Sequence, residues 1–207
     1  MCGRYSLTSY VQMHGFKPRY NIAPSQNAPI VTEDGVEEAR FGLVPAWEKD
    51  FSTKFSTINA RAETVQTSKL YARLLKKNRC LIPATSFFEW KTTIKGKQPM
   101  LIKLKTRSLF YFAGLYDTWH KGDRDEHKSF TIITTRPNSF MSSIHDRMPR
   151  ILEKDQEKPW LNEEIVNYKV FFDDVFPASQ MTAYPVSTLV NRPINDSSAV
   201  IEPLIQS

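Results

Sequence analysis

Apolar residues occur along this chain in short runs of the kind that β-strands produce. Seven runs rich in β-branched and aromatic residues are bounded by turn residues: Cys2–Leu7, Ala28–Thr32, Val36–Leu43, Cys80–Lys91, Met100–Lys105, Leu109–Trp119 and Phe130–Thr135. Turn residues at Glu33–Gly35 and Lys95–Lys97 separate successive runs, as in β-hairpins. The pattern therefore predicts a largely antiparallel sheet.

Helical patterns are fewer. In Val65–Lys77, leucines recur at helical spacing with lysines and Arg73 on the other side, and Asp155–Asn162 is a second short candidate. We therefore expect the α+β class, with a curled, barrel-like, largely antiparallel β-sheet and a few peripheral helices. No repeat or Gly/Ser-rich linker divides the chain, which indicates a single domain over residues 1–207.

Composition narrows the class of protein. The 207 residues are 41% hydrophobic and 12% aromatic, which is enough for a packed core. We expect a cytoplasmic protein with no membrane association, because no run approaches the roughly 20 apolar residues of a membrane helix and no secretory signal is visible. The net charge of +6 favours a polyanionic partner. The two cysteines form no zinc pattern, Cys80 reads as an inert core residue, and no metal or organic cofactor is implied.

Cys2 directly follows the initiator methionine. Removal of Met1 would leave an amine with a pKa of about 8 and a thiol with a pKa of about 8.5 on one residue. Such a 1,2-aminothiol traps aldehydes, because the amine forms a Schiff base and the thiolate then closes a thiazolidine ring. The alternative is that position 2 is simply a small residue on a frayed chain end.

Two polar residues stand just before the first predicted helix, in the segment Ser56–Thr64. The side chain of Asn59 can orient a substrate, and Arg61 can bind a phosphate through two hydrogen bonds. The structural alternative is that Asn59 supports a turn and Arg61 pairs with Glu63.

Glu89 lies between bulky aromatic residues in a strand-like run. Desolvation in such a setting raises the pKa of a carboxyl group and would let it transfer protons near pH 7. The alternative is a glutamate at the solvent end of a strand, next to Lys91.

His145, Asp146 and Arg147 are consecutive and lie shortly before Pro149, which indicates a loop or the start of a strand. His145 is a candidate acid or base, and Arg147 a candidate phosphate contact. The alternative is an ion pair between Asp146 and Arg147.

Two rigid, aromatic, proline-bounded segments, Pro18–Gln26 and Phe41–Trp47, are predicted to be loops and are candidate walls of a binding site. Trp47 or Trp90, exposed beside arginines, would suit single-stranded nucleic acid, whose bases stack on aromatic rings. Ordinary core filling is the alternative for both tryptophans.

Seven motifs follow one another from Cys2 to about Pro149, with a weaker echo at Ala183–Ser187. They read Met-Cys-Gly-Arg, Tyr-Asn-Ile-Ala-Pro-Ser-Gln, Gly-Leu-Val-Pro-Ala-Trp, Asn-Ala-Arg-Ala-Glu-Thr, Arg-Cys-Leu-Ile-Pro-Ala, Phe-Glu-Trp and His-Asp-Arg-Met-Pro. Together and in this order, they resemble the motifs of the SOS-response-associated peptidase (SRAP) family.

The resemblance implies a DNA repair protein of the SOS response that senses abasic sites in single-stranded DNA. It implies a covalent DNA–protein crosslink through Cys2, formed as a thiazolidine with the ring-opened sugar aldehyde, which shields the lesion from strand cleavage. By the same analogy Asn59 orients the amine or sugar, Glu89 shuttles protons, and His145 assists and supports reversal. The family name also implies a thiol peptidase that removes the residue before Cys2; we do not expect general proteolysis.

We assign DNA contacts to six further residues by the same resemblance. Arg4, Arg61 and Arg147 would contact phosphates, Trp47 and Trp90 would line the DNA channel, and Pro24 would help to hold the strand bent at the lesion. We expect a monomer that is nucleoid-associated when bound to DNA, and the sequence names no partner at replication forks.

Two other functions remain open at this point. In an amino-terminal-nucleophile hydrolase or amidotransferase, the same Cys2 attacks an amide and turns over. In a noncovalent single-strand binding module, Cys2 is incidental.

Overall fold

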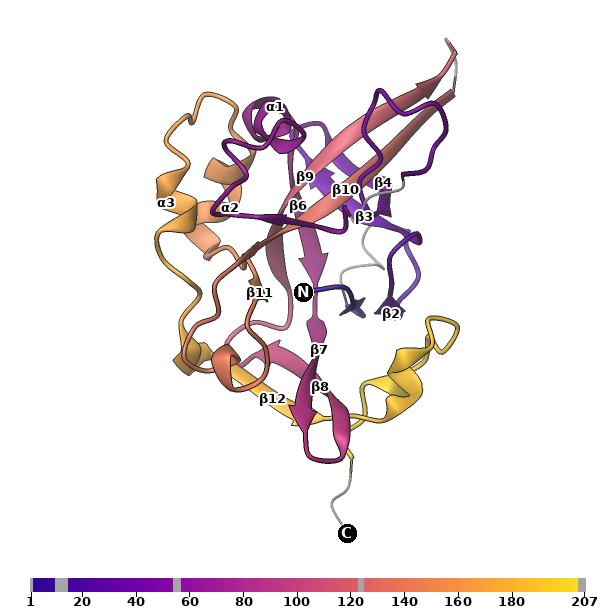
Figure 1. Ribbon diagram of the computed structural model, residues 1–207, viewed down its shortest axis with the longest axis vertical. Helices are drawn as coiled ribbons and strands as arrows, with labels where there is room; N and C mark the ends of the chain where they lie inside the picture. Colours follow the sequence, from indigo (N-terminus) through magenta and orange to yellow (C-terminus); the bar gives the residue numbers. More distant parts are fainter. Residues whose placement is uncertain (1, 10–14, 54–56, 123–124, 205–207) are drawn as a thin grey trace.

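In the computed structural model of the protein, the structure is described for residues 2–9, 15–53, 57–122 and 125–204. It consists mostly of β-strands in two sheets, with short helices at the periphery, which confirms the predicted α+β class (Figure 1). Met1, whose removal the aminothiol hypothesis requires, and Ser56 of the Asn59 motif lie outside the described residues.

Five strands close into a barrel: β3 (Asn27–Thr32), β4 (Gly35–Phe41), β6 (Arg79–Ala84), β9 (Phe110–Lys121) and β10 (Asp125–Thr135). β4 pairs with β3, β3 with β6, β6 with β9, β9 with β10, and β10 again with β4. The β10–β4 contact is parallel and the other four are antiparallel. Each barrel strand is therefore hydrogen-bonded on both sides, which removes open sheet edges.

Two short strands extend the barrel along β10. β5 (Asn59–Arg61) pairs with it in parallel, and β11 (Met148–Pro149) pairs with it antiparallel. Because both strands attach to β10, the Asn59 motif and the His145 motif meet on one side of the barrel.

The second sheet is antiparallel and contains β12 (Met181–Pro185), β8 (Gly96–Leu104), β7 (Ser86–Thr93), β1 (Tyr5–Leu7) and β2 (Arg19–Ile22), in that order. In Figure 1 the strands β7, β8 and β12 lie below the barrel. The sheet brings the start of the chain, through β1, beside the strand that carries Glu89.

The predicted continuous strand Cys80–Lys91 is wrong, because the chain divides at Thr85 into β6 and β7. There, the Thr85 amide donates to the Ser6 carbonyl at 2.8 Å, and the Ser6 hydroxyl lies 2.6 Å from that of Ser86. These contacts to β1 take the chain out of the barrel and into the second sheet.

Among the described residues, three α-helices pack outside the barrel: α1 (Tyr71–Lys77), α2 (Lys154–Leu161) and α3 (Lys169–Phe172). α2 confirms the expected helix at Asp155–Asn162 to within one residue at each end. α1 begins six residues later than the expected Val65–Lys77, because turn hydrogen bonds to the Thr64 carbonyl occupy Thr67 and Ser68. No helix in the described parts of the chain has the length and apolar character needed to cross a bilayer.

β2 lies in a segment that the sequence indicated as a loop. Its backbone amides at Tyr20 and Asn21 donate to Oδ1 of Asp196, at 2.5 and 2.9 Å, and Arg19 forms an ion pair with the same carboxylate. The strand therefore depends on a residue near the other end of the chain.

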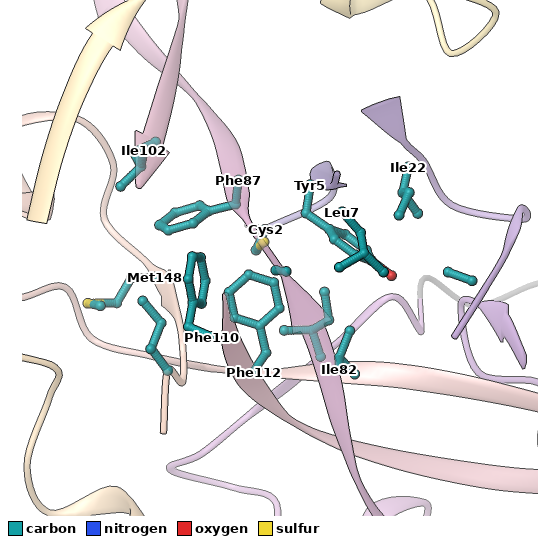
Figure 2. Packing of buried hydrophobic residues seen from close by; sticks show 14 of the residues in the cluster. Cys2, Tyr5, Leu7, Ile22, Ile82, Phe87, Ile102, Phe110, Phe112 and Met148 are labelled. Carbon is teal, nitrogen blue, oxygen red and sulfur yellow. The ribbon is translucent and has the colours of Figure 1, made fainter. Parts of the chain in front are cut away.

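The main core fills the barrel and the space under β7. It contains Cys2 at 0% exposure, together with Tyr5, Phe87 and Phe112, whose rings meet edge to face (Figure 2). The frayed-end alternative for Cys2 is therefore wrong. Cys80 is also fully buried, as expected.

We predict that Gly114→Ala destabilises the barrel. Gly114 faces Cys80 across β6 and β9, and a Cβ atom there would lie 2.5 Å from Cδ1 of Ile82 and 2.9 Å from Sγ of Cys80. Urea denaturation should show a loss of about 1–3 kcal/mol in the free energy of unfolding. Ile82→Val, which removes Cδ1, should recover part of this loss in the double variant; an unchanged midpoint for Gly114→Ala would contradict the close approach.

Candidate active site

Cys2 is held in place by Asn59. Nδ2 of Asn59, the first residue of β5, donates to the Cys2 carbonyl at 3.1 Å and to the Ile132 carbonyl at 3.4 Å. Burial raises the pKa of the Cys2 thiol far above its ordinary value, and the charge of Glu89 acts in the same direction. In the closed site the thiol is therefore protonated at neutral pH, so it needs a base before it can attack.

The side-chain oxygen of Asn59, Oδ1, is a hydrogen-bond acceptor that can take a donor from a bound molecule. Oδ1 is buried and has no hydrogen-bond partner among the described residues. A buried carbonyl oxygen without a donor is costly, and such atoms in folded proteins call for a specific explanation. Beside Cys2, this oxygen is placed to accept an N–H or O–H group of a bound reactant.

Glu89 lies on β7 with its side chain 2% exposed. This excludes the alternative of a glutamate at the solvent end of the strand. Burial raises the pKa of Glu89 from 4.5 to about 7. A carboxyl group with this pKa is present in both protonation states at neutral pH, which is the condition for transferring protons in both directions.

His145 closes the other side of the site. It follows the 3-10 turn η2 (Met141–Ser143), and its Nε2 lies 3.7 Å from Oε2 of Glu89. Nδ1 lies 3.1 Å from the Arg147 amide and 2.9 Å from the Asp146 carboxylate, which fixes the ring with Nε2 toward Glu89. Burial lowers the pKa of His145, so the neutral ring predominates at pH 7.

The structure thus brings together the four residues predicted to be catalytic. Cys2 comes from the start of the chain, Asn59 from β5, Glu89 from β7 and His145 from the turn before β11. Contacts of Asn59 with Cys2, and of His145 with Glu89, link them in pairs. No group of three or more His, Cys, Asp and Glu side chains in the described residues is arranged to hold a metal ion.

The charged residues do not form the ion pairs that the sequence offered as structural alternatives, Arg61 with Glu63 and Asp146 with Arg147. Glu63 does not pair with its neighbour Arg61 but accepts two hydrogen bonds from Arg147, at 2.7 and 2.9 Å. Asp146 lies 2.9 Å from Nδ1 of His145 instead of pairing with Arg147. Arg147 also donates to the Thr134 carbonyl at 2.6 Å, which anchors the His145 turn to β10. Arg61 is exposed at the end of β5.

Arg4 and Trp90 form one cluster with the C-terminal segment. Nη1 of Arg4 donates to Oδ1 of Asn21 at 2.8 Å and to the Val190 carbonyl, and its guanidinium lies 5.9 Å from the Trp90 ring centroid. Nε1 of Trp90 donates to Oδ1 of Asn191 at 2.8 Å. Both side chains are half-buried and are held by these contacts within the protein. The contacts with DNA predicted for Arg4 and Trp90 stay predictions.

Trp47 and Pro24 stand on separate loops. Trp47 is 59% exposed, with the guanidinium of Arg73 5.1 Å from its ring centroid, and Arg73 is ion-paired with the buried Asp117. Pro24 is half-buried and precedes Ser25, whose φ of +72° is a strained backbone conformation for a residue other than glycine. Sequence reasoning placed Arg73 opposite the leucines of the first predicted helix but did not predict its contact with Trp47.

The profile of the SOS response associated peptidase (SRAP) family matches residues 1–193. The chain belongs to the SRAP family. Two SRAP relatives are similar over most of their length. The chain is 42% identical to the abasic site processing protein YoaM of Bacillus subtilis, over 98% of each chain. It is 31% identical to the abasic site processing protein HMCES of Xenopus tropicalis, over 92% of this chain and 67% of the relative.

A solved structure has the same fold. A crystal structure of a protein from Bacteroides thetaiotaomicron superposes with a TM-score of 0.83 at 28% identity, over 98% of this chain and 93% of that one. The barrel and the second sheet are therefore an architecture that this chain shares with a solved protein.

We predict that Glu89 makes the stability of this SRAP protein pH-dependent. Its pKa is about 7 in the folded state and about 4.3 in an unfolded chain. The folded state thus binds more protons between these values, so the stabilisation is complete below about pH 4.3 and is lost as the pH rises toward 7.

Glu89→Gln should remove this dependence. The difference in unfolding free energy between wild type and variant should change by about 2 kcal/mol from pH 5 to pH 8, with the variant gaining at high pH. Urea denaturation at both pH values measures it, and Glu163→Gln, at an exposed glutamate, is the control. Parallel curves for wild type and Glu89→Gln would contradict the raised pKa.

Proposed function

We propose that this protein recognises abasic sites in single-stranded DNA and forms a covalent crosslink to them through Cys2 after removal of Met1. The observation that carries the proposal is the convergence of Asn59, Glu89 and His145 on the one residue that would then bear both an amine and a thiol. The names of the relatives, abasic site processing proteins, support the substrate class.

The first step joins the amine to the ring-opened sugar. The α-amine of Cys2 attacks the aldehyde carbon to give a carbinolamine, which loses water to form a protonated Schiff base, an iminium ion. Asn59 Oδ1 accepts an N–H of the amine and orients its lone pair toward the aldehyde. Protonated Glu89 supplies the proton with which the hydroxyl group leaves as water.

The second step closes the ring. The Glu89 carboxylate, left by the first step, takes the thiol proton, and the sulfur adds to the iminium carbon while the C=N electron pair returns to the nitrogen, which keeps its one proton. Glu89 therefore ends protonated, as it began, with Nε2 of His145 beside its Oε2. The products are one thiazolidine and one water molecule, with no change in oxidation state. Because burial suppresses the ionisation of Cys2, this base is required for sulfur attack.

Single-stranded DNA suits the site because the sugar must leave the helical stack to reach Cys2. Among the three predicted phosphate contacts, Arg61 is the exposed one, and we propose it as a direct contact. Arg147 and Arg4 act at least in part by holding the His145 turn and Trp90 in place. Self-removal of the residue before Cys2 is the peptidase activity that this arrangement favours, since the thiol lies next to that amide bond.

We predict a denaturation-resistant adduct between protein that begins at Cys2 and single-stranded DNA with one abasic site. A denaturing gel and intact-mass measurement should show a one-to-one adduct whose mass is the sum of both components less one water. Cys2→Ala and an undamaged strand are the controls and should give no band. No adduct from protein confirmed to begin at Cys2 would overturn the proposal, and turnover of an amide substrate would favour the hydrolase.

We also predict that Glu89→Gln slows crosslinking at pH 7 by about 100-fold or more, because the amide cannot transfer a proton. In the wild type, the rate should change with an apparent pKa near 7, and this transition should be absent in the variant. Noncovalent DNA affinity, measured in the Cys2→Ala background, should be nearly the same with and without Glu89→Gln. An unaltered pH–rate profile would exclude Glu89 as the proton-transfer group.

A further inference from the structure

The loop that carries Trp47, residues 43–51, lies along one face of the hairpin formed by β9 and β10. In Figure 1 this hairpin extends beyond the barrel as a long two-stranded ribbon. Asp117 on β9 lies opposite Ser129 on β10, and Trp119 is two residues from Asp117, so the three side chains leave the same face of the hairpin. All three form hydrogen bonds with this segment, which we call the Trp47 loop.

The hairpin holds the Trp47 loop on both sides of its exposed indole. Before Trp47, the Val44 amide donates to Oγ of Ser129 at 2.7 Å, and the same hydroxyl donates to the Val44 carbonyl at 3.3 Å. After Trp47, the Glu48 carbonyl accepts a hydrogen bond from Nε1 of Trp119 at 2.8 Å. The backbone that carries Trp47 is therefore fixed to two strands of the barrel.

Asp117 adds a contact to each side of this arrangement. Its carboxylate is buried, at 3% exposure, and Oδ1 accepts the Thr118 amide at 3.1 Å. Oδ2 accepts the Ala46 amide at 2.9 Å and forms an ion pair with Arg73 of α1. The guanidinium of Arg73 in turn lies over the Trp47 ring, 5.1 Å from its centroid. One buried carboxylate thus holds both the residue before Trp47 and the cation that packs on its indole.

The ion pair determines what Arg73 can contribute to DNA binding. Since Asp117 compensates its charge, Arg73 adds little net attraction for a phosphate. Its flat guanidinium instead supports one face of the indole. The Trp47 side chain stays 59% exposed, so a second ring can stack on it.

We propose that Asp117 is a positioning residue that fixes Trp47, through Arg73 and the Ala46 amide, in an orientation that stacks on a base of the bound strand. The inference rests on the proposed function, because it requires a single strand whose bases are free to stack. Asp117 itself contacts no DNA. An indole that is free before binding has to be ordered when a base stacks on it, and the ordering of one side chain lowers affinity about two- to tenfold.

Binding of an abasic single-stranded oligonucleotide in the Cys2→Ala background tests the proposal. The variant Arg73→Met/Asp117→Asn removes both charges of the pair and leaves the net charge unchanged. Its affinity should be about two- to tenfold lower. The slope of log K against log salt should change by less than half of the roughly 0.7 that one phosphate contact gives. A loss of the full 0.7 would make Arg73 a phosphate contact and overturn the proposal. Arg107→Met/Glu157→Gln, which removes a half-buried ion pair next to α2, is the matched control and should leave the affinity unchanged.

The same measurement in a Trp47→Ala background separates positioning from general support of the fold. The double change should then have no effect on affinity, because the side chain that it positions is gone. An equal loss with and without Trp47 would show that the pair only supports the fold, against the proposal. If the double variant does not fold, Arg73→Lys carries the test, because this half-exposed position keeps its ion pair but loses the flat guanidinium. It should lower the affinity with Trp47 present and not without it.

The wild type distinguishes failure of this inference from failure of the proposed function. Wild-type protein beginning at Cys2 that neither binds nor crosslinks the abasic strand would refute the proposed function. Normal binding and crosslinking that do not depend on the pair of Asp117 with Arg73 would refute only the positioning role.

Discussion

The hydrogen bond from Asn59 to the Cys2 carbonyl fixes the start of the chain inside the protein. Chain ends are usually poorly ordered, yet here Cys2 lies at 0% exposure in the main core. The bond works because β5 is held in register by β10, so the amide group of Asn59 is itself immobile. Everything proposed for the site requires this fixed position, because amine, thiol and proton donors must meet within hydrogen-bond range.

Charged side chains buried among carbonyl groups support the same region from outside. Arg150, the residue after β11, is 2% exposed and donates to the Phe171 and Ile151 carbonyls and to Gln156, which ties the end of β11 to α2 and α3. Arg79 likewise donates to carbonyls at the ends of α1 and α2. A buried arginine that donates hydrogen bonds to several backbone carbonyls holds the segments that carry them in fixed positions. The helices therefore stabilise the barrel wall that carries β10 and, with it, Asn59 and Arg147.

Local signals explain what could be predicted from the sequence. Glu33–Gly35 does connect β3 to β4, and the hairpin at Lys95–Lys97 connects β7 to β8, because turn chemistry is a property of a few consecutive residues. The burial of Glu89 could likewise be expected from its aromatic neighbours. The clustering of four distant residues could not be read from periodicity; it was expected only through the resemblance of the motifs.

Contacts between distant residues explain what could not be predicted. β2 has little apolar alternation and owes its place to Asp196, near the other end of the chain. The charged neighbours Arg61 and Glu63 do not pair. Instead, Arg147, just before β11, donates two hydrogen bonds to the Glu63 carboxylate, one from each Nη atom. The split at Thr85 depends on β1 in the same way. In each case the deciding partner is remote in sequence.

The burial of Cys2 also limits which dissolved molecules can reach its thiol. A cysteine with a reactive amine on the same carbon would, at an open chain end, condense with any free aldehyde and oxidise readily. Here the sulfur is packed against Tyr5, Phe87 and their neighbours and is kept protonated by the same burial (Figure 2). Burial in the hydrophobic core thus keeps the Cys2 thiol out of contact with dissolved aldehydes and oxidants.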